Sequence, residues 1–221
     1  IAIGQVQGTG AASPRVGQTV TVEGVVTADF RQGLGGFFLQ DAGDGDPATS
    51  DALFVPLAFD ASADDGAVPK VGQRYRVRGE VTELELGRQG SRLTAIIPAD
   101  IERLPVATAP APAPVVLAAA PADWEALEGM RVRIAAPLTV SGTDQVERFG
   151  ELTTAFEGRL WQPSEVAAPG SEAFQRVLED NARRRLTLDD GSGERDPKAI
   201  AWLGGQPLPR VGTTLKEVEG I

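Results

Sequence analysis

The chain has 221 residues, of which 42% are hydrophobic and 24% charged, the composition of an ordinary globular protein. Its formal net charge of -10 makes a large basic footprint for duplex DNA unexpected. With no His and no Cys, the chain lacks a histidine general base, a Ser-His-Asp triad and a thiolate zinc site. Carboxylate chemistry with a metal stays open. No apolar run approaches the roughly 20 residues that a membrane span requires, so we expect no span. We also expect a monomer.

A repeated turn-and-strand pattern marks the N-terminal half. Residues 16–26 (VGQTVTVEGVV) and 71–81 (VGQRYRVRGEV) are identical at six of eleven positions. In each copy Val-Gly predicts a turn, and the alternation of apolar and polar residues that follows predicts a strand. Gly24 and Gly79 lie inside these strands, which indicates a bend or bulge. Small closed barrels need long, sharply coiled strands of this kind.

Three shorter strands complete the first domain. Residues 36–41 and 52–57 predict two strands between the repeats, and 91–97 predict a fifth after them. Five strands with a connection after the third are typical of an OB-fold, a small Greek-key barrel. We therefore expect one OB-fold-like barrel over residues 1–105.

The rest of the chain predicts a linker and a fainter copy of the barrel. Residues 106–121 are nearly all Ala, Pro and Val, which favours a semi-rigid linker or an extended edge segment packed on a domain. Residues 122–221 echo the barrel strands, and 171–181 predict a helix. A fifth strand would come after Ile221, so the second barrel is either truncated there or closed differently. The expected fold class is all-β, with two tandem OB-fold-like five-stranded Greek-key barrels, the second incomplete.

Outward aromatic side chains on the first barrel indicate a nucleic-acid surface. If Phe37 and Leu39 point into the barrel, Phe38 and Gln40 point out, and Phe54 points out from the next strand. Exposed aromatic rings on these strands of an OB-fold can stack bases, at roughly 1–3 kcal/mol per base. The alternative is that one phenylalanine of each pair packs against the other domain or the linker.

Arginines flank the same surface. Three arginines lie in loops beside this surface, where they could meet phosphates. The arginines at every second position of the second repeat form a row, which is either a phosphate track or a solvated strand face paired with glutamates. A further cluster, Arg183–Arg185, precedes a strand in the second half. The nucleic-acid-binding residues predicted for the barrel are Phe38, Gln40, Phe54, Arg31, Arg88, Arg92, Arg74 and Arg76.

An Asp-rich loop is the main candidate metal site, and calcium is the cofactor that it suggests. Carboxylates at alternate positions supply the hard oxygen ligands that calcium prefers. The spacing does not match an EF-hand loop. The alternative is a polar turn whose Asp side chains cap the backbone. The candidate ligands are Asp41, Asp44, Asp46 and Asp51.

Several segments together resemble a known family, the N-terminal region of large secreted bacterial nucleases. The segments are 24–30 (GVVTADF), 36–41 (GFFLQD), 45–51 (GDPATSD), 71–73 (VGQ), 137–142 (PLTVSG), 159–163 (RLWQP) and 186–191 (LTLDDG). The resemblance implies OB-like modules ahead of a catalytic domain of the endonuclease/exonuclease/phosphatase superfamily. That domain uses His, Asp, Asn and Glu around a divalent metal. Because this chain has no His, it resembles the accessory region without its nuclease, and no catalytic residue carries over.

The leading hypothesis is a non-catalytic, nucleic-acid-binding accessory region of a secreted, extracellular or cell-envelope nuclease. It would hold single-stranded DNA weakly and in a salt-sensitive way, because the chain is acidic. One alternative is a structural module that positions a nuclease domain of the same polypeptide and binds no nucleic acid. Another is a calcium-bound surface module. An autonomous carboxylate-metal nuclease is the least favoured hypothesis.

Overall fold

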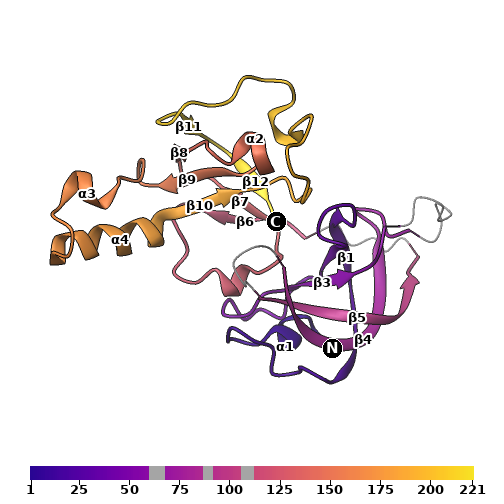
Figure 1. Ribbon diagram of the computed structural model, residues 1–221. Coiled ribbons are helices and arrows are strands. Elements are labelled where there is room, and N and C mark those ends of the chain that lie inside the picture. The colour runs from indigo at the N-terminus through magenta and orange to yellow at the C-terminus, as the bar shows by residue number, and fades with distance from the viewer. Residues whose placement is uncertain (60–67, 87–91, 106–111) are drawn as a thin grey trace. The chain divides into compact units, whose positions relative to one another are not determined.

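The computed structural model describes residues 1–59, 68–86, 92–105 and 112–221 (Figure 1). These residues are mostly strands with few helices, as the sequence predicts. They divide into two compact units. Unit 1 comprises Ile1–Val115, Ala122–Val132 and Glu219–Ile221, and unit 2 comprises Val116–Pro121 and Arg133–Val218. Residues 122–132, which the sequence pattern assigned to the second domain, therefore belong to the first unit.

A closed five-stranded barrel forms the centre of unit 1 (Figure 1). Around the barrel the strand order is β1-β2-β3-β5-β4, with β3 and β5 parallel and the other neighbours antiparallel. A short helix, α1 (Gly4–Gln7), precedes it. The strands are β1 (Thr19–Phe30), β2 (Gly36–Gln40), β3 (Ala52–Pro56), β4 (Arg74–Glu85) and β5 (Arg92–Arg103).

Both predicted glycines permit a close approach of backbones, at the Gln40 carbonyl for Gly24 and at the Ile97 carbonyl for Gly79, and Gly79 also marks an irregularity. The register between β4 and β5 shifts between Arg78 and Gly79, which confirms an irregularity there. At Gly24 the β1–β4 register is continuous. A Cβ on Gly24 would lie 2.8 Å from the Gln40 carbonyl oxygen, so this glycine permits a close approach of backbones.

The barrel core confirms the predicted inward faces. Its buried side chains include Val22, Phe37, Leu39, Tyr75 and Val77, all from positions that the period-two pattern places inside. Neighbouring residues point to the other side of each strand. There Phe38, Phe54 and Ala95 form a second buried cluster.

Unit 2 is built on an open four-stranded sheet with the order β10-β9-β8-β11. Val140, Val146 and Leu152 form its buried core. A second closed barrel is thus not confirmed in the described part of the chain. The strands are β8 (Leu138–Gly142), β9 (Leu152–Phe156), β10 (Arg185–Leu188) and β11 (Thr214–Leu215). A further three-stranded sheet has the order β12 (Val218–Gly220), β7 (Val132–Ile134) and β6 (Val115–Leu117).

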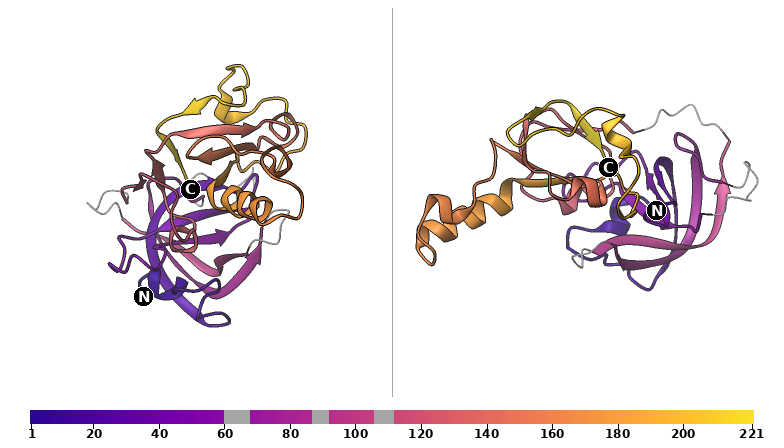
Figure 2. Two further views of the ribbon diagram at one scale, coloured as in Figure 1. Left: turned by 90° about the vertical axis from the view of Figure 1, so that its left-hand side faces the viewer. Right: turned by 45° about the horizontal axis from the view of Figure 1, so that its top comes forward.

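Helix α4 (Glu172–Arg184) confirms the predicted helix and extends it by three residues at the C-terminal end. Its N-cap is Ser171, whose Oγ accepts a hydrogen bond from the Phe174 N–H. Helix α3 (Pro163–Val166) lies beside it (Figure 2). The remaining helical turns are η1 (Glu125–Leu127), α2 (Val146–Phe149) and η2 (Ala201–Leu203). No helix in the described ranges is long and apolar enough to cross a membrane.

Candidate functional site

The predicted stacking residues point away from the barrel core, but they are buried. The Phe38 and Phe54 rings meet edge to face with centroids 5.2 Å apart, and Phe30 meets Phe38 at 6.0 Å. Phe38 is 6% exposed and Phe54 is 1% exposed. The predicted direction of these side chains is therefore correct, and their predicted exposure is wrong. Neither ring has an open face on which a base can stack.

Residues 122–132, which we call the covering segment, lie against the Phe38 ring at Gly129. Gly129 has φ +69°, and a Cβ at this position would be only 2.8 Å from the Phe38 Cδ1 atom. The Ser50 Oγ donates a hydrogen bond of 2.6 Å to the Glu128 carbonyl. The Arg131 N–H donates to the Gln40 Oε1 at 3.1 Å. Gln40 was predicted to face a ligand, and it holds the covering segment instead.

The Glu128 side chain anchors the covering segment in a partly buried position. Its Oε1 accepts hydrogen bonds from the Gln7 Nε2 at 3.0 Å and from the Thr94 N–H at 2.9 Å. Burial raises the pKa of the Glu128 carboxyl to about 7, against the opposing effect of these two bonds. Sequence reasoning missed Glu128, because its partners lie far from it along the chain.

The arginine row on β4 is paired with glutamates. Arg76 lies opposite Glu23 on β1 and opposite Glu102 on β5, and its guanidinium is 2.8 Å and 2.7 Å from their carboxylates. Arg74 also contacts Glu23, at 3.1 Å. Of the two alternatives, the structure therefore shows the paired strand face. The register explains the pairing, because cross-strand neighbours are the residues that long side chains reach.

Two of the three predicted loop arginines, Arg31 and Arg92, lie within the described residues. The Arg31 guanidinium lies 2.6 Å from the Asp29 carboxylate, and its side chain is 8% exposed. This hydrogen bond holds the pKa of Asp29 below its usual range. Arg92 is exposed and lies 3.9 Å from Glu85. Arg88 falls outside the described residues.

One hollow of 530 Å³ on unit 1 does bring several predicted residues together. Gln40, Asp41, Asp51 and Arg74 line it, together with Glu23. The lining thus carries three carboxylates and one arginine that is already paired with Glu23. Its charge disfavours a phosphate ligand, because like charges repel in a partly desolvated space.

The Asp-rich loop caps its own backbone. Asp41 accepts hydrogen bonds from the Ile3 and Gly43 N–H groups, each at 2.8 Å. The carboxylates of Asp44, Asp46 and Asp51 accept from further N–H groups within the loop. Burial raises the pKa of Asp51. The capping alternative is what the structure shows. No group of three acidic side chains arranged to hold a metal occurs within the described residues, and calcium binding stays a prediction.

Comparison with protein-family models, curated proteins and solved structures finds no match to this chain. The function of the chain is therefore inferred from its residues and their geometry.

Proposed function

We propose that this chain is a non-catalytic accessory region in which an OB-fold-like barrel acts as a structural module. The covering segment carries this proposal, because it occupies the outer face of the barrel at Phe38. The closed order β1-β2-β3-β5-β4 fits the five-stranded Greek-key barrel of OB-folds. In such barrels the face of strands 2 and 3 binds ligands, and here that face is filled by the protein itself.

The charges around the barrel support the same role. Arg31, Arg74 and Arg76 each contact a carboxylate at 3.1 Å or less. A guanidinium that is already paired with a carboxylate gains little further electrostatic stabilisation from a phosphate. These three arginines and the two buried rings therefore offer little to a nucleic-acid strand.

The resemblance to the N-terminal region of secreted bacterial nucleases supports an accessory place beside a catalytic domain. The chain has no His, so the catalytic set expected of that domain is incomplete here. The partner proposed for the module is the nuclease domain of the same polypeptide, and the location proposed for it is extracellular or at the cell envelope.

The test measures stability and DNA affinity for the same variants. Phe38→Ala should lower the free energy of unfolding by about 3–5 kcal/mol, the usual cost of emptying a buried phenylalanine site. The matched control is Phe59→Ala, because Phe59 is 46% exposed and its loss should cost less than about 0.5 kcal/mol. Both are then compared with the unmodified chain by fluorescence anisotropy with a labelled single-stranded oligonucleotide. A Phe38→Ala protein of normal stability that has lost DNA binding would overturn the structural role.

A second candidate function, weak binding of single-stranded nucleic acid, is favoured by one observation on unit 2. Trp161 is 46% exposed, and the Arg159 guanidinium lies 3.6 Å from the centroid of its ring. An exposed aromatic ring beside a cation is a common element of sites that bind single strands. This function does not depend on the barrel.

A further inference from the structure

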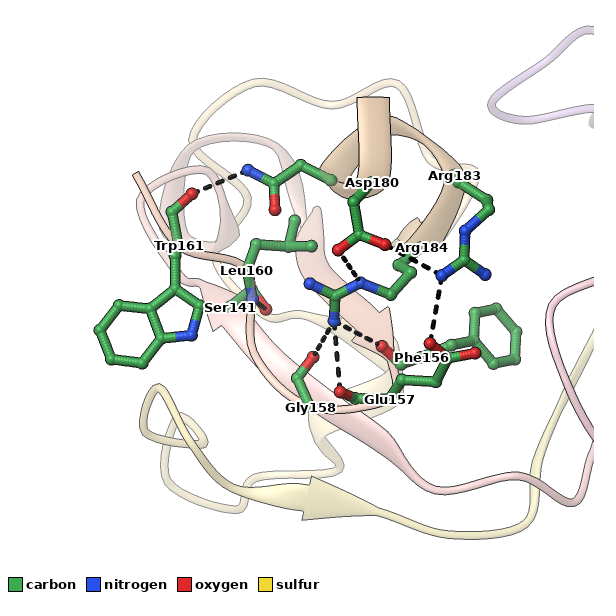
Figure 3. Close-up of polar contacts among 10 residues, drawn as sticks. Ser141, Phe156, Glu157, Gly158, Leu160, Trp161, Asp180, Arg183 and Arg184 are labelled. Carbon is green, nitrogen blue, oxygen red and sulfur yellow. Dashed lines mark hydrogen bonds and ion pairs between the residues drawn. The ribbon is translucent and has the colours of Figure 1, made fainter. Parts of the chain in front are cut away.

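A polar hollow of 780 Å³ opens on unit 2, and Arg185 from the arginine cluster of residues 183–185 lines it. Its walls come from the end of β8, from β9, from the loop of residues 159–162 with the start of α3, from the C-terminal half of α4 and from the first residue of β10. Figure 3 shows the contacts that shape this region.

Arg184 fixes the turn that leads into the hollow (Figure 3). Its Nη1 donates to three successive carbonyl oxygens, those of Phe156 at 3.1 Å and of Glu157 and Gly158 at 3.3 Å. Its Nε donates to the Asp180 carboxylate at 2.7 Å. Arg184 is 8% exposed, so its guanidinium is buried, while the Asp180 side chain is 45% exposed. A phosphate-binding role for this arginine is therefore ruled out by its own contacts.

The loop is held at two further points. The Asn181 Nδ2 donates to the Trp161 carbonyl oxygen at 2.7 Å. The Leu160 N–H donates to the Ser141 Oγ at 3.0 Å (Figure 3). Arg159 and Trp161 are thus presented by a backbone that is fixed before any ligand arrives. Fixing a site in advance lowers the entropy cost of binding.

The Asn181 side chain has one unsatisfied atom. Asn181 lines the hollow and is 7% exposed, and its Oδ1 has no hydrogen-bond partner among the described residues. The Oδ1 atom has almost no exposed surface, so it is sealed within the wall and a ligand in the hollow does not reach it. The contact of Asn181 that bears on the site is the hydrogen bond from its Nδ2 to the Trp161 carbonyl oxygen.

The charges of the lining also differ from those of the barrel. Arg159 and Arg185 line the hollow, and neither has a carboxylate partner within the part of the chain that the structure describes. Asp144 and Glu165 line it as well. The hollow therefore offers two unpaired guanidinium groups for an anion and several acceptors for hydrogen-bond donors, beside an indole ring.

We propose that this hollow binds a nucleotide unit of single-stranded nucleic acid, with the base against Trp161 and a phosphate at Arg159 or Arg185. This proposal rests on the second candidate function and names its site. A flat base matches a platform in which a guanidinium is already stacked on an indole ring. A guanidinium binds phosphate with paired hydrogen bonds. A neutral sugar would leave both arginines uncompensated, and a sugar acid is the rival ligand that the test includes.

The first experiment varies the ligand and leaves the protein unchanged. Isothermal titration compares dAMP with the abasic nucleotide deoxyribose 5-phosphate, which keeps the phosphate and lacks the base. We expect dAMP to bind about tenfold more tightly, because only dAMP has a base to stack on Trp161. Equal affinity for the two nucleotides would overturn the assigned stacking on Trp161. Binding of an oligogalacturonate without binding of either nucleotide would overturn the ligand class.

The second experiment varies the protein. Trp161→Ala should weaken binding of a labelled oligo(dA) by about fivefold or more, since base stacking is lost. Trp202→Ala is the matched control in the same unit, because Trp202 is 38% exposed and is not part of the lining. Arg159→Ala is compared in the same way with Arg176→Ala, whose side chain is exposed on α4. Trp161→Phe keeps an aromatic ring and guards against simple misfolding of the alanine variant.

The outcomes separate this proposal from the proposed role of the barrel. Oligonucleotide binding that is unaffected by both Trp161→Ala and Arg159→Ala would overturn the site while leaving nucleic-acid binding in place. Absence of binding by every nucleotide probe at low salt would overturn the site and the second candidate function. The structural role of the barrel is judged by the stability of the Phe38→Ala variant, which neither result changes.

Discussion

Substitution of Gly129 by alanine tests whether the covering segment closes the barrel face. Gly129 has φ +69°, a conformation that costs an L-residue about 1–2 kcal/mol. The new Cβ would lie 2.8 Å from the Phe38 Cδ1 and 3.0 Å from its Cε1. Because that ring is buried against Phe30 and Phe54, it has little room to move, and overpacking adds about 1–3 kcal/mol. We expect a total loss of about 2–5 kcal/mol in the free energy of unfolding.

The control for this substitution is Gly17→Ala. Gly17 has φ +79°, and a Cβ on it would meet nothing within 4 Å, so it should lose only the cost of the backbone strain. Urea unfolding gives both free energies, with fluorescence of Trp124 in the covering segment as a local signal. Phe38→Leu in the Gly129→Ala background should recover part of the loss, since it makes space for the methyl group. An equal loss for the two glycine variants, with no recovery, would show that the segment does not press on Phe38.

Three further predictions concern other buried polar groups. Because the pKa of Glu128 is raised, the contribution of its protonated carboxyl to stability is complete below pH 4.5 and is lost as the pH rises to about 7. The free energy of unfolding should therefore fall by at most about 3 kcal/mol over this range. Glu128→Gln should remove this fall when denaturant unfolding is measured between pH 4.5 and 8. Arg184→Ala should lower the free energy of unfolding of unit 2 by about 2–4 kcal/mol, because it removes the donor of three carbonyl oxygens. Arg176→Ala, at an exposed ion pair, is the control and should cost less than about 0.5 kcal/mol. Equal losses for the two variants in thermal or urea unfolding would contradict this assignment. Asp41→Ala should lower the free energy of unfolding by about 1–2 kcal/mol, with or without calcium, because its two hydrogen bonds to backbone N–H groups are lost. A loss of stability that appears in thermal melts only when calcium is present would instead support a metal site.

The barrel strands and their inward faces could be predicted because both are local properties of the chain. Side chains alternate along a strand, so Phe37 and Leu39 point to one side and Phe38 to the other whatever the rest of the protein does. The repeat at residues 16–26 and 71–81 likewise marks two strands that pair with each other. The helix over α4 was predictable from its apolar spacing and its N-terminal serine.

Exposure could not be predicted in the same way, because it depends on segments that are distant in sequence. The alternation shows which way Phe38 points, but only the fold shows that Gly129 lies against its ring. The sequence shows that Arg74 and Arg76 lie on one face of a strand, but the pairing of Arg76 with Glu102 depends on the register of β4 and β5. An ion pair between neighbouring strands is formed by tertiary structure, not by spacing along one strand.

The hollow on unit 2 shows most clearly the difference between local properties of the chain and properties that depend on the fold. The sequence alone establishes that the chain has no His or Cys, that it is strand-rich and acidic, and that arginines cluster at Arg183–Arg185. The fold shows that the Arg184 guanidinium donates to three carbonyl oxygens, while Arg185 lines a hollow with Trp161. Composition and periodicity describe each residue and its near neighbours along the chain. Burial, pairing and an unsatisfied acceptor such as the Asn181 Oδ1 arise only when distant segments meet.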